Sequence, residues 1–174
     1  MKRMSIVAVA LSMLVAACSD KTTAPSGPTT TTNVFTSTLL PANEVPPVAN
    51  AESGGTGTVT VTMLSTKDAS GNVTGATATF VVNLTGFPPN TPINLAHIHP
   101  GAAGVNGSPL VNLNLASGEV VLNASGGATF TKPSVGVDAP VAQQIINTPA
   151  SFYFNVHSTL NPGGVARGQL VKTQ

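Results

Sequence analysis

The sequence predicts an all-β domain, either an antiparallel β-sandwich or a barrel-like fold, with one short helix. Short runs rich in Val, Thr and Phe alternate apolar and polar residues with a period of two, and Gly, Pro and Asn separate these runs. A single segment that begins near Asp138 spaces its apolar residues as a helix does. We expect strands at residues 34–39, 56–64, 76–84, 93–99, 110–115, 119–122, 128–131, 151–157 and 165–171.

The clearest strands are segments 56–64 and 76–84. Each alternates cleanly, which is typical of a sheet with one packed face and one wet face. Ser70-Gly71-Asn72 lies between them and suits the turn of a hairpin. The side chains expected to face the core are Val59, Val61, Met63, Ala78, Phe80, Val82 and Leu84.

Prolines and glycines predict the turns and loops. Segment 43–48 contains two prolines, which remove donors from a ladder, so it is expected to be an edge segment or a loop. Asn161-Pro162-Gly163-Gly164 has Pro and Gly at the positions that a type II turn prefers. Segments 119–122 and 128–131 flank Ser125-Gly126-Gly127 and are expected to form a further pair of strands.

The single helix is expected to begin after Asp138. Asp is a preferred residue at the N-cap, and Pro140 is tolerated in the first turn. Val141 and Ile145 then lie on one side of the helix and predict a short apolar stripe.

The amino-terminal end is predicted to be a targeting segment outside the fold. Lys2 and Arg3 form a positive region, and the apolar run that follows is shorter than the about 20 residues that cross a bilayer. Small residues precede Cys18, the only cysteine, in an arrangement that resembles a bacterial lipobox. We therefore expect a lipoprotein signal peptide at 1–17 and lipidation of Cys18. The alternative is an ordinary secretory signal with an incidental cysteine.

Two further regions follow the signal peptide. Residues 18–33 have no large apolar side chain and are predicted to be a lipid-anchored flexible Thr/Pro/Ser linker. Residues 34–174 are predicted to form one β domain. Ser19 after the lipidated cysteine favours the outer membrane, so we expect a protein anchored in the cell envelope by its lipid, in the periplasm or at the cell surface.

Charge is scarce. The chain has seven Lys and Arg residues, and five remain from Cys18 onward because Lys2 and Arg3 lie in the leader. These five oppose six Asp and Glu residues, so the mature chain carries a net charge of −1. Since no basic stripe exists to neutralise phosphates, nucleic acid is not an expected partner.

Histidines supply the strongest candidate for chemistry. His97 and His99 are two apart in segment 93–99, so on a strand both lie on one face. His157 ends the most hydrophobic strand, 151–157, on the same face as Tyr153 and Asn155. Three imidazoles suffice to hold zinc or copper. The alternative is that they bond to a glycine-rich loop and backbone, or contact an organic ligand.

Five motifs together resemble the CHRD (chordin-type) domain family. They occur in the family's order and span most of the chain from Phe35 to Leu170. The motifs are Phe35-x-x-x-Leu39; Asn43-Glu44-Val45-Pro46-Pro47; Ala96-His97-Ile98-His99 with the loop to Gly107; Phe154-Asn155-Val156-His157; and Arg167-Gly168-Gln169-Leu170.

The resemblance implies a binding or structural module. In animals the domain is repeated in the extracellular antagonist chordin, whose partners are bone morphogenetic proteins, and bacterial members are commonly single-domain exported proteins. The family often has Gly-Glu-Ile-Arg-Gly in its last motif, whereas this chain has Val165 in place of the acid. An acidic neighbour for Arg167 at that position is therefore absent.

Four other residues are candidate site partners. Glu44 is either a fourth ligand or a partner of a histidine or Arg167, or else an edge charge. Arg167 either binds a carboxylate or anchors the fold. Asn155 and Tyr153 share the face of His157, although Tyr153 also suits an ordinary sheet position.

No catalytic constellation is recognisable in the sequence. The serines lack a nucleophile-elbow motif, and HExxH is absent. We therefore expect no enzyme but a binding or structural module, whose ligand is an unidentified protein or small molecule. A His-based zinc or copper protein is the alternative, and a metal-dependent enzyme is the weakest one.

Overall fold

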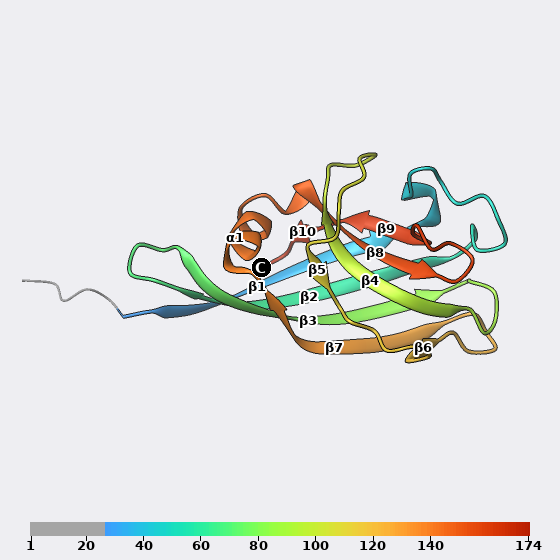
Figure 1. Cartoon of the computed structure of the whole chain (residues 1–174), viewed down its shortest axis with the longest axis horizontal. Coiled ribbons are helices and arrows are strands. Elements are labelled where there is room, and N and C mark those ends of the chain that lie inside the picture. Colours follow the sequence, from blue (N-terminus) through green and yellow to red (C-terminus); the bar gives the residue numbers. More distant parts are fainter. Residues whose placement is uncertain (1–26) are drawn as a thin grey trace, which may run out of the picture.

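The computed structural model describes residues 27–174, which form two antiparallel sheets and one α-helix (Figure 1). The first sheet has the order β10-β1-β2-β3-β7, and the second has the order β5-β4-β8-β9 with β6 also paired to β4. Their bounds are β1 Thr29–Leu39, β2 Thr56–Lys67, β3 Val73–Thr85, β4 Pro92–Pro100, β5 Val111–Asn112, β6 Val120–Val121, β7 Ala128–Val137, β8 Phe152–Ser158, β9 Ala166–Gln169 and β10 Val171–Lys172. The predicted β-sandwich is confirmed.

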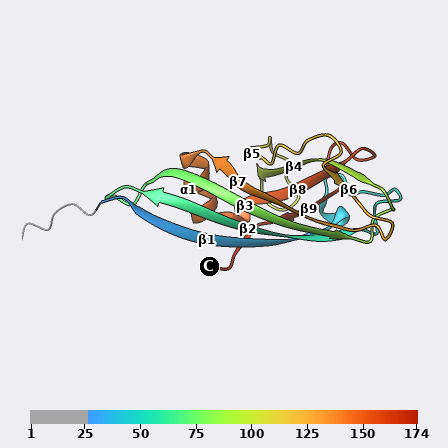
Figure 2. The same cartoon turned by 90° about the horizontal axis from the view of Figure 1, so that it is seen from below.

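The core lies between the two layers, which Figure 2 shows edge on. All seven side chains predicted to face inward from β2 and β3 are buried. Phe80 of the first sheet stacks on Phe154 of the second, with ring centroids 5.9 Å apart. The period-two pattern therefore identified the packed faces correctly, and burial of these apolar side chains holds the sheets together.

The first strand begins earlier than predicted. Residues 29–33, part of the predicted linker, belong to β1 and pair with the end of β2, from Thr29 opposite Lys67 to Asn33 opposite Met63. Threonine is a strong strand former, and a long ladder does not require each residue to bury apolar area. The predicted linker is therefore too long at its carboxyl end. The predicted signal peptide 1–17, the predicted lipidation site Cys18 and the predicted linker as far as residue 26 lie outside the described residues.

The predicted pairing of segments 119–122 and 128–131 is wrong. β6 pairs with β4 in the second sheet, whereas β7 pairs with β3 in the first. The turn at Gly126 therefore carries the chain from one layer to the other. Gly126 has φ +72°, and a side chain there would overlap the carbonyl oxygen of Phe87. Glycine permits this close approach. The prediction of a turn here is therefore confirmed, whereas the predicted pairing of its flanking strands is not.

The last predicted strand also divides between the sheets. β9 pairs with β8, and β10 pairs with β1. Leu170 lies between them and is fully buried, which fixes the crossing point in the core. The predicted strand 110–115 shortens to β5, because Asn114 has φ +50° and leaves the extended conformation.

Helix α1 (Ala139–Asn147) begins after Asp138 as predicted, although the Asp138 side chain makes no capping hydrogen bond. Ile145 is buried as expected, but Ala142 and Ile146 accompany it and Val141 is only partly buried. Two 3-10 turns, η1 (Pro41–Asn43) and η2 (Pro149–Ser151), complete the fold. Within residues 27–174, no helix has the length and apolar character needed to cross a membrane.

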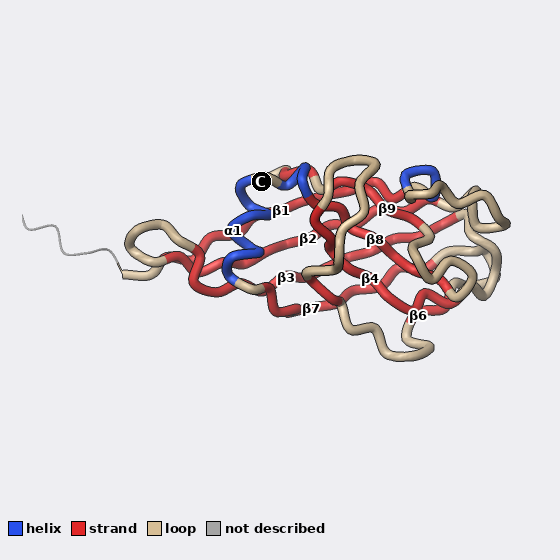
Figure 3. Tube along the Cα trace, turned by 45° about the horizontal axis from the view of Figure 1, so that its top comes forward, coloured by secondary structure: helices blue, strands red, loops and turns tan. Residues whose placement is uncertain are grey.

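Three loops cover the outer face of the second sheet. They run from residue 44 to 55, from 101 to 110 and from 159 to 164, and Figure 3 shows long loops crossing this side of the molecule. The turn between residues 161 and 164 is closed by Gly164 N–H donating to Asn161 O at 3.1 Å. Its positive φ lies at Gly164 and not at Gly163, so the turn is not the predicted type II. These loops bury a sheet face that would otherwise meet water.

Candidate functional site

Polar side chains occupy the outer face of the second sheet. His97 lies opposite Asn155 across the β4–β8 ladder, and His99 lies opposite Tyr153. Arg167 of β9 lies opposite Asn155 on the other edge of β8, so His97, Asn155 and Arg167 form one row across three strands. The prediction that His97 and His99 share a face is confirmed, and the antiparallel register places the Asn155 side of β8 beside them.

The three imidazoles converge. Their ligand nitrogens lie within 4.8 Å of one another, and each histidine is only 6% exposed. His97 Nδ1 is 3.1 Å from His157 Nε2. Ring centroids are 4.9 Å apart for His97 and His157 and 5.3 Å apart for His97 and His99. Residues that are 60 positions apart in the chain thus form one cluster.

Backbone carbonyls fix the orientation of two rings. His99 Nδ1 donates to Gly107 O at 2.9 Å, and His157 Nδ1 donates to Pro162 O at 2.9 Å. A carbonyl only accepts, so the hydrogen of each neutral ring is on Nδ1 and Nε2 carries the lone pair, which has no partner in His99. Nε2 of His157 then accepts from His97 Nδ1. Metal-binding histidines are oriented by the same device, a carbonyl on the nitrogen that does not bind.

The electrostatics of the cluster favours neutral rings. Burial, together with the smaller effects of the neighbouring His157 and His99, lowers the pKa of His97 to about 4. Burial is also the main cause that lowers the pKa of His99 and of His157, against the opposing effect of their carbonyl partners. Imidazole binds a metal only when it is deprotonated. The cluster therefore presents ligands in the required state at neutral pH.

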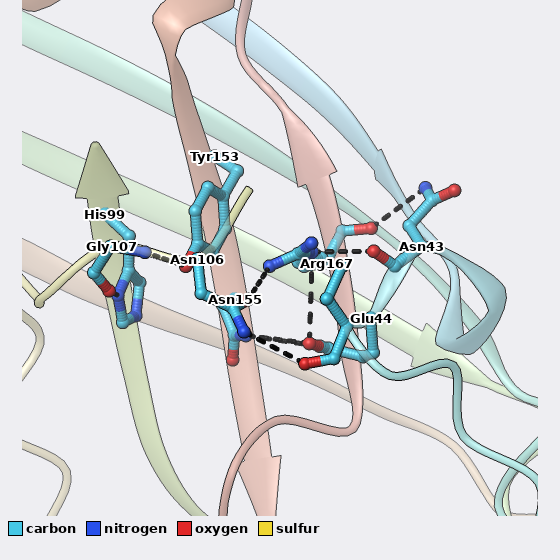
Figure 4. Close-up of polar contacts among 9 residues, drawn as sticks. Asn43, Glu44, His99, Asn106, Gly107, Tyr153, Asn155 and Arg167 are labelled. Carbon is cyan, nitrogen blue, oxygen red and sulfur yellow. Dashed lines mark hydrogen bonds and ion pairs between the residues drawn. The ribbon is translucent and has the colours of Figure 1, made fainter. Parts of the chain in front are cut away.

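Tyr153 packs against one side of the histidine cluster. Its ring stacks on His99 with centroids 4.8 Å apart and planes 5° apart. Its hydroxyl oxygen accepts from Gly107 N–H at 3.2 Å, and Gly107 also holds His99. The guanidinium of Arg167 lies over Tyr153, 4.6 Å from its ring centroid, and Figure 4 shows the order His99, Tyr153, Arg167. Tyr153 is thus a packing partner of the site and not an ordinary sheet residue.

Glu44 contacts Asn155 and Arg167. Both carboxylate oxygens accept from Asn155 Nδ2, at 3.1 and 3.3 Å, and Oε2 lies 4.0 Å from Arg167 Nε (Figure 4). Burial raises the pKa of Glu44 to about 7, because it outweighs the lowering effects of Arg167 and Asn155. Since no hydrogen bond joins Glu44 to a histidine, its predicted role as a direct histidine partner is not observed, and the predicted contact with Arg167 is.

Arg167 is held mainly by neutral acceptors. Its Nε donates to Asn43 O at 2.6 Å, and Nη1 donates to Asn106 Oδ1 at 2.7 Å. Val165, at the position where the family often has an acid, is fully buried in the core. The acidic neighbour of Arg167 is therefore Glu44, from a motif that is distant in the sequence.

Glu52 lies at the other end of the site, and no pattern in the sequence assigned it a role. Glu52 is 2% exposed and its Oε2 accepts from Ser158 Oγ at 2.6 Å and from Asn161 Nδ2. This contact ties the 44–55 loop to the turn that carries Pro162. The sequence does contain one indication of a role for Glu52, because it is one of only six acidic residues in the chain.

Two hollows flank segment 44–47. One has a volume of about 370 Å³ and is lined by Asn43, Glu44 and Arg167 among others. The second, about 250 Å³, lies between Glu44 and the 160–164 turn. Their linings contain no histidine, so a molecule bound in either would meet Glu44 before it met an imidazole.

Fold and site together define an all-β sandwich module whose loop-covered outer face bears a buried histidine cluster. The family model of the CHRD domain matches residues 35–170, which is most of the chain. The chain therefore belongs to the CHRD domain family, and the resemblance predicted from its motifs is confirmed. No curated protein and no solved structure matches the chain.

Proposed function

We propose that this CHRD domain is a metal-binding module in which His97, His99 and His157 hold zinc or copper. The observation that supports it is the convergence of three buried imidazole nitrogens within 4.8 Å. Zinc–nitrogen distances of about 2.0–2.1 Å in a tetrahedral site place ligand nitrogens about 3.3 Å apart. The 3.1 Å between His97 Nδ1 and His157 Nε2 is already close to that spacing.

Binding requires two local changes. His97 must release its Nδ1 hydrogen toward Nε2, which turns the nitrogen that now donates to His157 into a ligand. The nitrogens that are farther apart, up to 4.8 Å, must also approach by as much as about 1.5 Å, a movement that side-chain rotation can supply. The carbonyls of Gly107 and Pro162 stay in place because they hold the opposite nitrogens of their rings.

A purely structural role for the histidines is the alternative, and metal content decides between the two. Full-length protein with Cys18→Ser, which removes the thiol and the lipid, is dialysed against zinc or copper and then analysed for metal. We expect one ion per chain and a rise of the melting temperature. The same chain with all three histidines changed to alanine is expected to bind none. Equal metal content in both would refute the proposal.

We further propose that the protein is exported and anchored in the cell envelope by a lipid on Cys18. The charged and apolar leader and the small residues before the only cysteine support this. Detergent phase separation and cell fractionation test it. Wild-type protein is expected in the membrane fraction, and the Cys18→Ser chain is expected to leave it. Recovery of the wild-type chain from the cytosol would contradict the proposal.

The family supports a binding or structural role in place of catalysis, because CHRD domains are not enzymes. A second candidate ligand is a small polar molecule or a protein segment in the hollow beside Glu44 and Arg167. The observation in its favour is that this hollow of about 370 Å³ has a buried guanidinium in its lining. If Arg167→Gln no longer binds that molecule or segment while its metal content is unchanged, this hollow is the ligand site.

A further inference from the structure

Unpaired polar atoms point to a further ligand at the histidine cluster. Among residues 27–174, the buried side-chain atoms without a hydrogen-bond partner are Asn33 Nδ2, His99 Nε2, Asn155 Oδ1 and Arg167 Nη2. An unpaired buried polar atom costs about 1–3 kcal/mol, so each calls for an explanation. A metal on the cluster accounts for His99 Nε2. The same metal, held by the three histidines alone, does not explain why Asn155 Oδ1 on the same sheet face has no partner.

Asn155 lies beside the proposed metal position. It faces His97 across the β4–β8 ladder, and the Cβ atoms of such directly opposed residues are about 4.5–5.5 Å apart. It also lies two positions before His157 on the same strand, so both side chains project from one face. Asn155 is only 2% exposed. Its short side chain therefore lies next to two of the three ligands.

Glu44 determines which end of the Asn155 amide faces the histidines. Both carboxyl oxygens of Glu44 accept from Asn155 Nδ2, so the amide directs its nitrogen toward Glu44. Glu44 lies on the β9 side of Asn155, next to Arg167, whereas β4 lies on the other side, with His97 opposite Asn155 in the ladder and His99 visible in Figure 4. Oδ1 and Nδ2 diverge from the same carbon of the planar amide, so Oδ1 turns away from Glu44 when Nδ2 turns toward it. Oδ1 is buried without a hydrogen-bond partner, so its lone pairs remain free for a ligand on the sheet face that it shares with the histidines.

We propose that Asn155 Oδ1 is the fourth donor of the metal centre formed by His97, His99 and His157. This inference rests on the proposed function and deepens it. Three imidazole nitrogens and one amide oxygen complete a four-coordinate site without a solvent position, which is the arrangement of structural zinc centres and not of catalytic ones. The metal would then join β4 to β8 beneath the loops, and Glu44 would act as the positioning residue for its fourth ligand.

Cobalt(II) is the probe, because its visible spectrum reports the number and type of ligands in a zinc site. The full-length Cys18→Ser chain is titrated with cobalt and then with azide, which binds only where a coordination position is open to solvent. We expect a four-coordinate spectrum that azide does not change. In Asn155→Ala we expect cobalt to bind at least about tenfold more weakly, with a spectrum that azide shifts.

Two variants separate ligation from folding. Asn155→Asp keeps an oxygen donor and is expected to restore insensitivity to azide. Asn83→Ala removes an exposed amide of the other sheet that accepts from Thr129 Oγ, and it is expected to match the parent chain in spectrum and affinity. Circular dichroism of each variant confirms that it is folded.

The outcomes are distinct. If the parent chain binds azide, or if Asn155→Ala keeps the parent spectrum, Asn155 is not a ligand while the three-histidine centre stands. If the parent chain takes up none of cobalt, zinc and copper, the proposed function fails together with this inference.

Discussion

The buried carboxyl of Glu44 provides a quantitative test of the site's electrostatics in the metal-free protein. Burial raises its pKa from 4.5 to about 7, against the opposing effects of Arg167 and Asn155. Glu44→Gln keeps the size of the side chain and an oxygen that accepts from Asn155, but it cannot ionise. The difference in stability between the two proteins at a series of pH values therefore isolates the titration of Glu44.

The sign of the effect follows from proton binding. Between pH 4.5 and 7 the unfolded chain loses the Glu44 proton while the folded chain keeps it, so the folded state binds more protons and the free energy of unfolding falls as pH rises. A rise in pKa from 4.5 to about 7 corresponds to a loss of about 3 kcal/mol across this window. Relative to wild type, Glu44→Gln should gain about that much between pH 4 and pH 8.

The histidines change the stability with pH in the opposite direction, but their contribution cancels when the two proteins are compared. The pKa of His97 falls from 6.5 to about 4, so the unfolded chain binds more protons in that range and stability falls as pH drops from 6.5 to about 4. His99 and His157 add to this loss because their pKa values are also lowered. These terms are present in both proteins, since both retain the three rings.

Urea denaturation in the presence of a chelator, from pH 4 to pH 8, measures the difference. The chelator removes bound metal, which would otherwise stabilise the folded state by mass action. A stability difference that stays constant over this range would refute the conclusion that burial controls Glu44. A difference that moves in favour of wild type as pH rises would show instead that the contact with Arg167 dominates.

Two further substitutions test the packing that positions the site. Gly168→Ala should prevent folding, because its Cβ would overlap the Thr38 carbonyl oxygen where β9 passes β1, whereas Gly136→Ala, with no atom within 4 Å, should leave the melting temperature unchanged. A folded Gly168→Ala protein would show that the two strands can separate. Phe154→Ala should lower the free energy of unfolding by about 3–5 kcal/mol, since the ring is fully buried and stacks on Phe80. A loss below about 1 kcal/mol in urea would contradict this account of the core.

Metal content and the cobalt titration test the donor atoms of the site. Glu44→Gln leaves the imidazoles and the Asn155 oxygen unchanged, so its effect is separate from theirs. Stability against pH thus tests the polar network, and metal content tests the histidines.

Local pattern was sufficient for the features that depend on neighbouring residues. Alternation along one strand decides which side chains share a face, so the inward residues of β2 and β3 and the shared face of His97 and His99 could be predicted. The CHRD motifs also identified the family, because they recur in a fixed order over residues 35–170.

Only the tertiary structure decided which strands are neighbours. The turn at Gly126 looks the same in sequence whether its flanking strands pair with each other or with different sheets, and the structure shows the second arrangement. The same reason hid the division between β9 and β10. Alternation is a property of one strand, whereas pairing depends on contacts between distant segments.

The histidine cluster combines both kinds of information. The sequence by itself determined that His97 and His99 project together, since two residues is one period of a strand. The antiparallel register of β4 and β8 decided that His157 joins them and that Asn155 lies between the cluster and Glu44. Burial beneath three loops then determined the neutral state of the rings, because desolvation disfavours their charged form.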